Sequence, residues 1–277
     1  MTIAMSPISE AIGVQVTGYT SSDFLAPNAA RDCQQLLDRH GVVVYREAHI
    51  TDADLVAFSR RLGEVVVAST GGHPDFPEIS PVTLDPSKSA LAGLRRSTIF
   101  WHTDGLTDAV PQKATLLTAR EVADDGGDTE FANTYAAYEA LPEEKKAEFE
   151  NCRVVHSVAA SQLLLTPDPT AEQRAKWDRA PSREHPLVWR RRNGRKSLLI
   201  GATAGDIVGM DHQRGRALLD ELLAWSTQPR FVLHHQWKVG DLVVWDNTGM
   251  LHRAMPYEPT SRRLMHRTTL VGEEAIT

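Results

Sequence analysis

Cysteine is scarce in this chain, which holds only Cys33 and Cys152 among its 277 residues. Two cysteines are too few for the disulfide framework on which small secreted proteins rely. We therefore expect two buried thiols in a protein of the reducing cytoplasm. The segment Met1–Glu10 agrees with this expectation, because it has neither the basic nor the apolar region of a signal peptide.

Positive charge and long apolar runs are also lacking. The formal net charge is −6 and the pI is about 6.0, which does not fit the basic surface of a nucleic-acid-binding protein. Apolar runs such as Gly41–Tyr45 are far too short to cross a bilayer. We expect no nucleic acid partner and no membrane partner. An acidic protein that binds an anion must concentrate its cations locally, so clustered arginines become informative.

Short strand patterns dominate the sequence, which shows no internal repeat and no shift in composition. Apolar, β-branched segments between turn residues predict strands at 12–19, 41–45, 78–82, 98–104, 113–121, 129–132, 153–157, 186–190, 196–200, 231–237, 241–245, 252–254 and 263–271. Helical spacing predicts helices at 28–39, from Thr51 to Leu62, and at 135–141, 142–151 and 211–226. The fold class is therefore mainly β with helices, as a sandwich or jelly roll decorated by helices, in a single domain over residues 1–277.

Two stretches lack a regular pattern. Residues 65–98 and 161–184 are polar or rich in glycine and proline. Long irregular segments inside a compact domain are often functional loops, so both are candidate lids over a site.

Potential metal ligands concentrate in the tetrapeptide Trp101-His102-Thr103-Asp104. On a strand, alternate side chains share a face, so His102 and Asp104 are expected to point the same way. An imidazole and a carboxylate form two thirds of a facial triad for non-haem iron(II). His252, which follows a strand and a turn, is the best candidate for the third ligand. We interpret the remaining candidates as surface or packing histidines, namely His156, His185, His234, His235 and His266.

Two arginines near the C-terminal end suit an anionic ligand. Arg263 and Arg267 lie four residues apart in a predicted strand and so share a face, whereas Arg262 and His266 point the other way. The neighbouring apolar residues indicate an inner strand rather than a solvated one. A guanidinium group binds a carboxylate through two parallel hydrogen bonds, as an α-keto acid would require.

Together these motifs resemble the taurine dioxygenase family, also called TauD/TfdA. The resemblance rests on the order and spacing of several segments between about Leu62 and Gly272. They are W-H-T-D at 101–104, G-G-D-T at 126–129, N-T-Y-A-A-Y-E-A-L-P at 133–142, H-P-L-V at 185–188, N-G-R-K-S-L at 193–198, W-D-N at 245–247, His252, and R-R-L-M-H-R at 262–267.

The resemblance implies a double-stranded β-helix, or jelly roll, with helices and lid loops around it. It implies that His102, Asp104 and His252 hold Fe(II), and that Thr129 and Arg263 bind the distal carboxylate of the co-substrate 2-oxoglutarate. Arg267, the one further catalytic residue, would lie near the metal-bound carboxylate and the anionic group of the substrate. The family couples oxidative decarboxylation of 2-oxoglutarate by O2 to hydroxylation, and its members suggest a homo-oligomer, either a dimer or a tetramer.

The substrate is expected to be a small anion with a C–H bond next to a heteroatom. Asp104 favours hydroxylation, because related halogenases have a small residue at that position. The histidine and tyrosine that taurine-oxidising members use find no match in Val65–Ala68, although His73 and Phe76 are a displaced alternative. The small residues Ile200–Gly205 are closer to members that act on aryloxyalkanoates. A taurine-type sulfonate and an alkyl sulfate remain open.

Two rival functions fit part of the same pattern. Zinc accepts the same three ligands and activates water, so a zinc hydrolase is one alternative. That alternative gives no role to Thr129, Arg263 and Arg267. A non-catalytic jelly-roll binding protein is the other, because a fold alone does not specify an activity.

Overall fold

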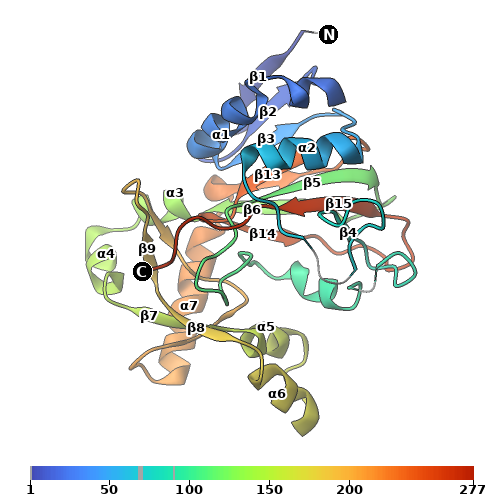
Figure 1. Cartoon of the computed structure of the whole chain (residues 1–277). Helices are drawn as coiled ribbons and strands as arrows, with labels where there is room; N and C mark the ends of the chain where they lie inside the picture. The colour runs from blue at the N-terminus through green and yellow to red at the C-terminus, as the bar shows by residue number, and fades with distance from the viewer. Residues whose placement is uncertain (1, 68–70, 90) are drawn as a thin grey trace.

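A seven-stranded sheet forms the centre of the computed structural model, which describes residues 2–67, 71–89 and 91–277. Its strand order is β1-β2-β3-β13-β5-β15-β4, with β2 and β3 parallel and the other neighbours antiparallel (Figure 1). The strands are β1 (Ala4–Pro7), β2 (Val14–Thr17), β3 (Val42–Tyr45), β4 (Ser80–Val82), β5 (Ala114–Glu121), β13 (Leu242–Asp246) and β15 (Leu264–Thr269). Strands from both ends of the chain therefore share one sheet.

A smaller sheet, of order β12-β6-β14, packs against one face of the large sheet. Its strands are β6 (Thr129–Asn133), β12 (Val232–His235) and β14 (Met250–Ala254). Phe131 from the small sheet and Val42, Val44 and Trp245 from the large sheet belong to the same buried cluster. The two sheets thus enclose an apolar layer, and the ends of their strands surround the candidate site.

Two helices cover the opposite face of the large sheet. These are α1 (Ala29–His40) and α2 (Asp52–Leu62), with the short 3-10 helix η1 (Ser21–Leu25) beside them (Figure 1). The hydroxyl of Thr51 caps α2 by accepting a hydrogen bond from the Asp54 N–H at 3.1 Å, as its position before Asp52 predicts. Phe58 packs fully buried against Phe24, and each such burial stabilises the fold by about 1.5–3 kcal/mol.

Most of the remaining elements lie below the two sheets in Figure 1, and α3 lies beside them. They include a sheet of order β11-β7-β8, a hairpin of β9 and β10, and several helices. Their bounds are α3 (Thr134–Glu139), α4 (Glu143–Phe149), β7 (Arg153–Ser157), α5 (Val158–Leu165), α6 (Ala171–Asp178), β8 (Ser182–Pro186), β9 (Val188–Arg190), β10 (Lys196–Leu198), β11 (Ala204–Ile207), α7 (His212–Ser226) and η3 (Pro229–Phe231). The 3-10 helix η2 (Leu94–Ile99) lies beside the candidate site.

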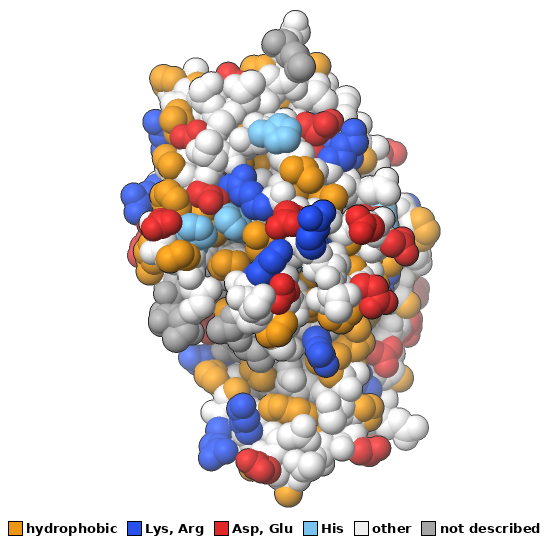
Figure 2. Space-filling view, turned by 90° about the vertical axis from the view of Figure 1, so that its right-hand side faces the viewer, with side chains coloured by type: hydrophobic (Ala, Val, Ile, Leu, Met, Phe, Trp, Pro, Cys, Tyr) orange, Lys and Arg blue, Asp and Glu red, His pale blue; other side chains and the backbone are white. Residues whose placement is uncertain are grey.

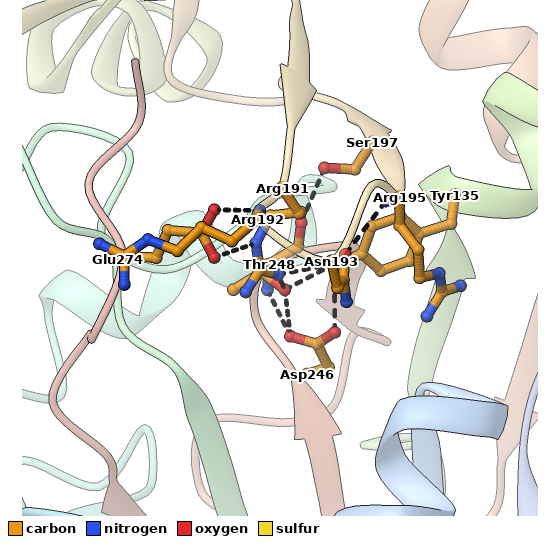
Figure 3. A network of polar contacts seen from close by, with 9 residues as sticks. All are labelled: Tyr135, Arg191, Arg192, Asn193, Arg195, Ser197, Asp246, Thr248 and Glu274. Carbon is orange, nitrogen blue, oxygen red and sulfur yellow. Dashed lines mark hydrogen bonds and ion pairs between the residues drawn. The ribbon is translucent and has the colours of Figure 1, made fainter.

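A buried polar network ties the C-terminal residues to the β9–β10 hairpin (Figure 3). Arg191 Nε donates to Glu274 Oε2 at 3.0 Å, and its Nη1 donates to Tyr135 Oη at 2.8 Å. Arg191 also bonds Thr248, whose N–H donates to Asp246 Oδ1 at 2.8 Å. Because the Asp246–Thr248 turn leads directly into β14, the network braces the strand that carries His252.

The structure corrects several local predictions. Residues 98–104 are not a strand: η2 ends at Ile99, His102 forms only an isolated bridge, and a turn begins at Asp104. The expected loop at 161–184 contains most of α5, all of α6 and the start of β8, because its prolines lie before and after α6 rather than within a helix. Cys152 is only partly buried, whereas Cys33 is fully buried, and both are free thiols.

The other strand and helix predictions agree with the structure to within a few residues. Within the expected irregular stretch 65–98, positions 68–70 and 90 lie outside the described residues. Among the helices of the described residues, none is long and apolar enough to span a membrane.

Candidate active site

His102, Asp104 and His252 converge, with their potential ligand atoms all within 4.8 Å of one another. This is the only such group of histidine, cysteine, aspartate or glutamate side chains in the described part of the chain. His102 and His252 exchange backbone hydrogen bonds of 3.0 and 2.8 Å, which bring their rings to a centroid distance of 4.2 Å. Asp104 Oδ2 lies 3.8 Å from His252 Nε2. The β-bridge and the following turn, rather than strand alternation, place the three side chains together.

Two glycines allow the backbone to approach this closely. Gly105 has φ +86°, and a Cβ there would lie 2.8 Å from the backbone nitrogen of Gln112. Gly201 has φ +105°, and a Cβ there would lie 2.7 Å from the carbonyl oxygen of Trp101. Both positions combine a left-handed φ with a contact that a side chain would block, so glycine is required on either side of the site.

The protonation states of the three residues suit a divalent metal. His102 Nδ1 lies 2.8 Å from the carbonyl oxygen of Phe100, which assigns the proton to Nδ1 and leaves the Nε2 lone pair for a ligand bond. Burial lowers the pKa of His252 to about 3, so its ring is neutral. Burial alone would raise the pKa of Asp104, but Arg267 and the neighbouring histidines lower it to about 2. One neutral imidazole, a second imidazole with a free Nε2 and one carboxylate fit iron(II).

A cavity of about 350 Å³ opens beside the two histidines. Thr129 and Arg263 both line it and are 5% and 3% exposed. Thr129 is the strand partner of Ala254, two residues along β14 from His252, or about 7 Å away. The indole N–H of Trp237 donates to Thr129 Oγ1 at 3.0 Å, so the hydroxyl hydrogen is free to point elsewhere. The cavity therefore has a hydroxyl donor and a guanidinium at a short distance from the candidate metal ligands.

Arg263 is held in place by the G-G-D-T segment. Its Nε donates to the carbonyl oxygen of Gly127 at 3.0 Å, and its guanidinium carbon lies 4.9 Å from the centre of the Tyr257 ring. A Cβ at Gly127, whose φ is +74°, would lie only 2.9 Å from Arg263 Cδ. Burial lowers the pKa of Arg263, whereas Tyr257 and Asp128 raise it. Gly127 thus provides both a hydrogen-bond acceptor and the space for this side chain.

Arg267 lies on β15 next to the candidate metal ligands. Its Nη1 is 3.4 Å from Asp104 Oδ2, and its Nε is buried without a hydrogen-bond partner among the described residues. Arg262 and His266 point away, as predicted: the Arg262 side chain is 88% exposed, and His266 packs against Asp52 at 2.7 Å.

A second, smaller cavity of about 160 Å³ also borders the ligand group. His102 and Thr98 line both cavities, whereas Asp104 lines only the smaller one. Ala202 and Thr203, from the segment predicted to form a small-residue wall, also line it. The ligand group therefore borders both a larger cavity and a recess with small walls.

The histidines that were not expected to bind the metal lie away from the ligand group. His156, His185 and His235 are buried packing residues, and His234 is half-exposed beside Asp128 and Glu130. His73 packs against His266 and Phe76, at ring distances of 5.5 and 5.7 Å. Ala68, at the end of the segment Val65–Ala68, lies outside the described residues.

Sequence reasoning missed some residues of the site. Trp237, Trp245 and Arg95 contact or line the large cavity without belonging to a metal-ligand or anion-binding pattern. Trp245 was quoted only as part of the W-D-N motif, and no local signal distinguishes Arg95 from the chain's other arginines.

Comparison with known proteins decides the family. The model of the "Taurine catabolism dioxygenase TauD, TfdA family" matches residues 4–269. The chain belongs to this family. An alpha-ketoglutarate-dependent 2,4-dichlorophenoxyacetate dioxygenase of Burkholderia sp. (strain RASC) is 34% identical over 272 residues, covering 93% of this chain and 91% of the relative.

Two further TauD/TfdA comparisons extend over nearly the whole chain. An alpha-ketoglutarate-dependent sulfate ester dioxygenase of Pseudomonas putida is 30% identical, over 96% of this chain and 89% of its own. The crystal structure of AAD-2 in complex with Mn(II) and N-oxalylglycine matches with a TM-score of 0.82 and 32% identity, covering 100% of both chains.

Family membership answers the question of reaction type. The chain is a 2-oxoglutarate-dependent dioxygenase that uses Fe(II), 2-oxoglutarate and O2 and acts on a small anionic substrate. The zinc hydrolase and the non-catalytic binding protein are therefore not supported. The fold is mainly β with helices, as expected.

Proposed function

We propose that this chain hydroxylates an aryloxyalkanoate at the carbon next to the ether oxygen. The observation that carries the proposal is the small-residue recess formed by Ala202 and Thr203 beside Asp104, which leaves room for a bulkier substrate than taurine. The identity to a 2,4-dichlorophenoxyacetate dioxygenase supports the same substrate class.

The residue roles follow from the geometry of the two cavities. We assign Fe(II) to His102, Asp104 and His252, and the distal carboxylate of 2-oxoglutarate to Thr129 and Arg263. When bound, Fe(II) and 2-oxoglutarate supply the oxidant, because O2 converts 2-oxoglutarate to succinate and CO2. Arg263 contributes a guanidinium group that can donate two parallel hydrogen bonds to a carboxylate, and Thr129 contributes a hydroxyl donor.

Arg267 has two roles in this proposal. Its contact with Asp104 holds the carboxylate in its ionised, metal-binding form. Its buried, unpaired Nε is a donor for the anionic group of the substrate. Hydroxylation then replaces the hydrogen on the ether carbon by a hydroxyl group, and the resulting hemiacetal breaks into a phenol and a 2-oxo acid.

The test is succinate release by purified protein with Fe(II), 2-oxoglutarate, ascorbate and O2. The panel comprises phenoxyacetate, 2-phenoxypropionate, taurine, a longer alkylsulfonate and an alkyl sulfate. Stimulation by the aryloxyalkanoates with release of a phenol is the expected result. Stimulation by taurine or by the sulfate alone would contradict the substrate class. His102→Ala should abolish turnover, whereas His212→Ala, whose ring is 74% exposed, should keep it.

We also propose that residues 1–277 form a single jelly-roll domain. The presence of β1 and β15 in one sheet and the apolar layer between the two sheets support this. One cooperative unfolding transition is expected, and two separable transitions would contradict a single domain.

We further propose a cytoplasmic homo-oligomer, a dimer or tetramer, on the basis of the family and the two free cysteines. Light scattering and cell fractionation test these two points.

A further inference from the structure

Arg95, from η2, lies next to Arg267 in the large cavity. Its Nη2 donates to Ser80 Oγ at 3.0 Å, and Ser80 is the strand partner of Arg267 across β4 and β15. Partnered residues on neighbouring strands project from the same face, with Cβ atoms about 5 Å apart. Ser80 therefore fixes Arg95 on the side of the sheet that carries Arg267.

The two guanidinium groups lack a sufficient counter-charge. The Nε atoms of Arg95 and Arg267 are both buried without a hydrogen-bond partner among the described residues. Burial and the charge of Arg267 lower the pKa of Arg95 to about 10, although Asp104 and Tyr257 act in the opposite direction. Asp104 is the only carboxylate that forms an ion pair with Arg267 in the described part of the chain. When Asp104 binds the metal, less of its charge remains for the arginines.

The other arginines of the cavity have partners or are exposed. Arg253 pairs with Glu130 at 2.6 Å, and Arg263 donates to Gly127. Arg96 follows Arg95 directly but is exposed. On the face drawn in Figure 2, basic and acidic side chains are interspersed rather than gathered into one basic patch. Anion recognition in this protein of net charge −6 therefore depends on buried cations.

We propose that Arg95 and Arg267 together bind the carboxylate of the substrate, so that Arg95 is a second, specificity-determining substrate ligand. This inference rests on the proposed function, because it takes the same substrate class. A carboxylate between two guanidinium groups satisfies both unpaired Nε–H donors and removes the repulsion between the like charges.

Binding to an inert enzyme tests the inference directly. Protein loaded with Mn(II) and N-oxalylglycine is titrated with phenoxyacetate, and with ethyl sulfate as a second anion, by calorimetry. Arg95→Gln should raise the Kd for phenoxyacetate about tenfold or more, since it removes a charged hydrogen-bond donor. Arg95→Lys should recover part of the affinity. Arg31→Gln, at an arginine that is 65% exposed and lies outside the cavity, is the control and should stay within about threefold of wild type.

A second titration separates this role from cofactor binding and folding. The Kd for N-oxalylglycine should be unchanged in Arg95→Gln and strongly raised in Arg263→Gln. If Arg95→Gln does not fold, Arg95→Lys takes its place, with a smaller expected loss. An unchanged Kd for phenoxyacetate in the folded Arg95 variants would overturn the inference. So would a wild-type protein that binds neither anion. Phenol release from phenoxyacetate by the wild-type enzyme reports on the proposed function alone, because it does not depend on which arginines bind the carboxylate.

Discussion

Replacing Gly127 by alanine should weaken 2-oxoglutarate binding, although this residue contributes no side chain. A Cβ at Gly127 would lie 2.9 Å from Cδ and 3.0 Å from Nε of Arg263, well inside ordinary carbon contact distances of about 3.5–4 Å. On the opposite side, it would already contact the Ala123 Cβ at 3.4 Å. The side chain of Arg263 therefore has to retreat from its position over the Gly127 carbonyl.

The size of the effect follows from two separate costs. The φ of +74° at Gly127 makes any L-residue unfavourable by about 1–2 kcal/mol, which lowers the free energy of unfolding. Moving Arg263 would disturb one or both of the hydrogen bonds that we propose it makes to the co-substrate carboxylate, each worth about 1.5–3 kcal/mol. We therefore expect the Kd for 2-oxoglutarate to rise at least about tenfold.

Gly194 provides the matched control. It has φ +84° in the β9–β10 turn, and a Cβ there would meet no atom within 4 Å. Gly194→Ala should therefore lose similar stability while keeping the wild-type affinity for 2-oxoglutarate. The assays are urea unfolding and calorimetric titration of 2-oxoglutarate into Mn(II)-loaded protein. Equal Kd values for Gly127→Ala and Gly194→Ala would refute the steric role of Gly127.

Three further predictions concern the metal site and the stability of the fold. Asp104→Ala should abolish substrate-stimulated succinate release, and release at the wild-type rate would contradict its assignment as a ligand. Burial and a nearby histidine hold the pKa of His156 at about 3, below the value of 6.5 outside the fold. As the pH falls, His156 therefore takes up its proton in the unfolded chain before it does so in the folded protein. The free energy of unfolding should fall by about 2 kcal/mol between pH 7 and pH 5 for this reason. His156→Leu should remove that share of the pH dependence in urea unfolding of the metal-free protein, whereas Thr203→Val, which deletes only the 2.9 Å hydrogen bond to His156, should retain it. Glu274→Gln should lower the free energy of unfolding by about 1–3 kcal/mol, because its carboxylate is 13% exposed and pairs with Arg191. Glu273→Gln should have little effect, because Glu273 is 63% exposed.

Elements with strong local signals were predictable from the sequence. The apolar run Val42–Tyr45 forms a central strand that is buried on both faces. Its alternate residues belong to two different buried clusters, which explains why all four residues are apolar. Thr51 marks a helix start because its hydroxyl satisfies a free backbone donor. The order of the motifs also predicted that His102, Asp104 and His252 come together.

Features that depend on distant partners were not predictable. His102 was assigned to a strand, but its conformation depends on a bridge to His252 near the other end of the chain. The prolines at 161–184 suggested a loop, although Thr170 and Gln173 form a capping box that signals the start of α6. Arg95 acquires its environment from Ser80 and Arg267 on other elements, which no local pattern encodes.

The placement of the two sets of binding groups has an evolutionary consequence. Thr129 and His252 belong to paired strands, where a change disturbs backbone hydrogen bonds and two packed layers. Ala202 and Thr203, in contrast, lie on the connecting segment before β11, at the wall of the small recess. Mutations at these walls leave the sheets intact, so they are tolerated at low cost to folding. Drift in these walls can therefore change the substrate while Thr129 and His252 keep their places on the paired strands.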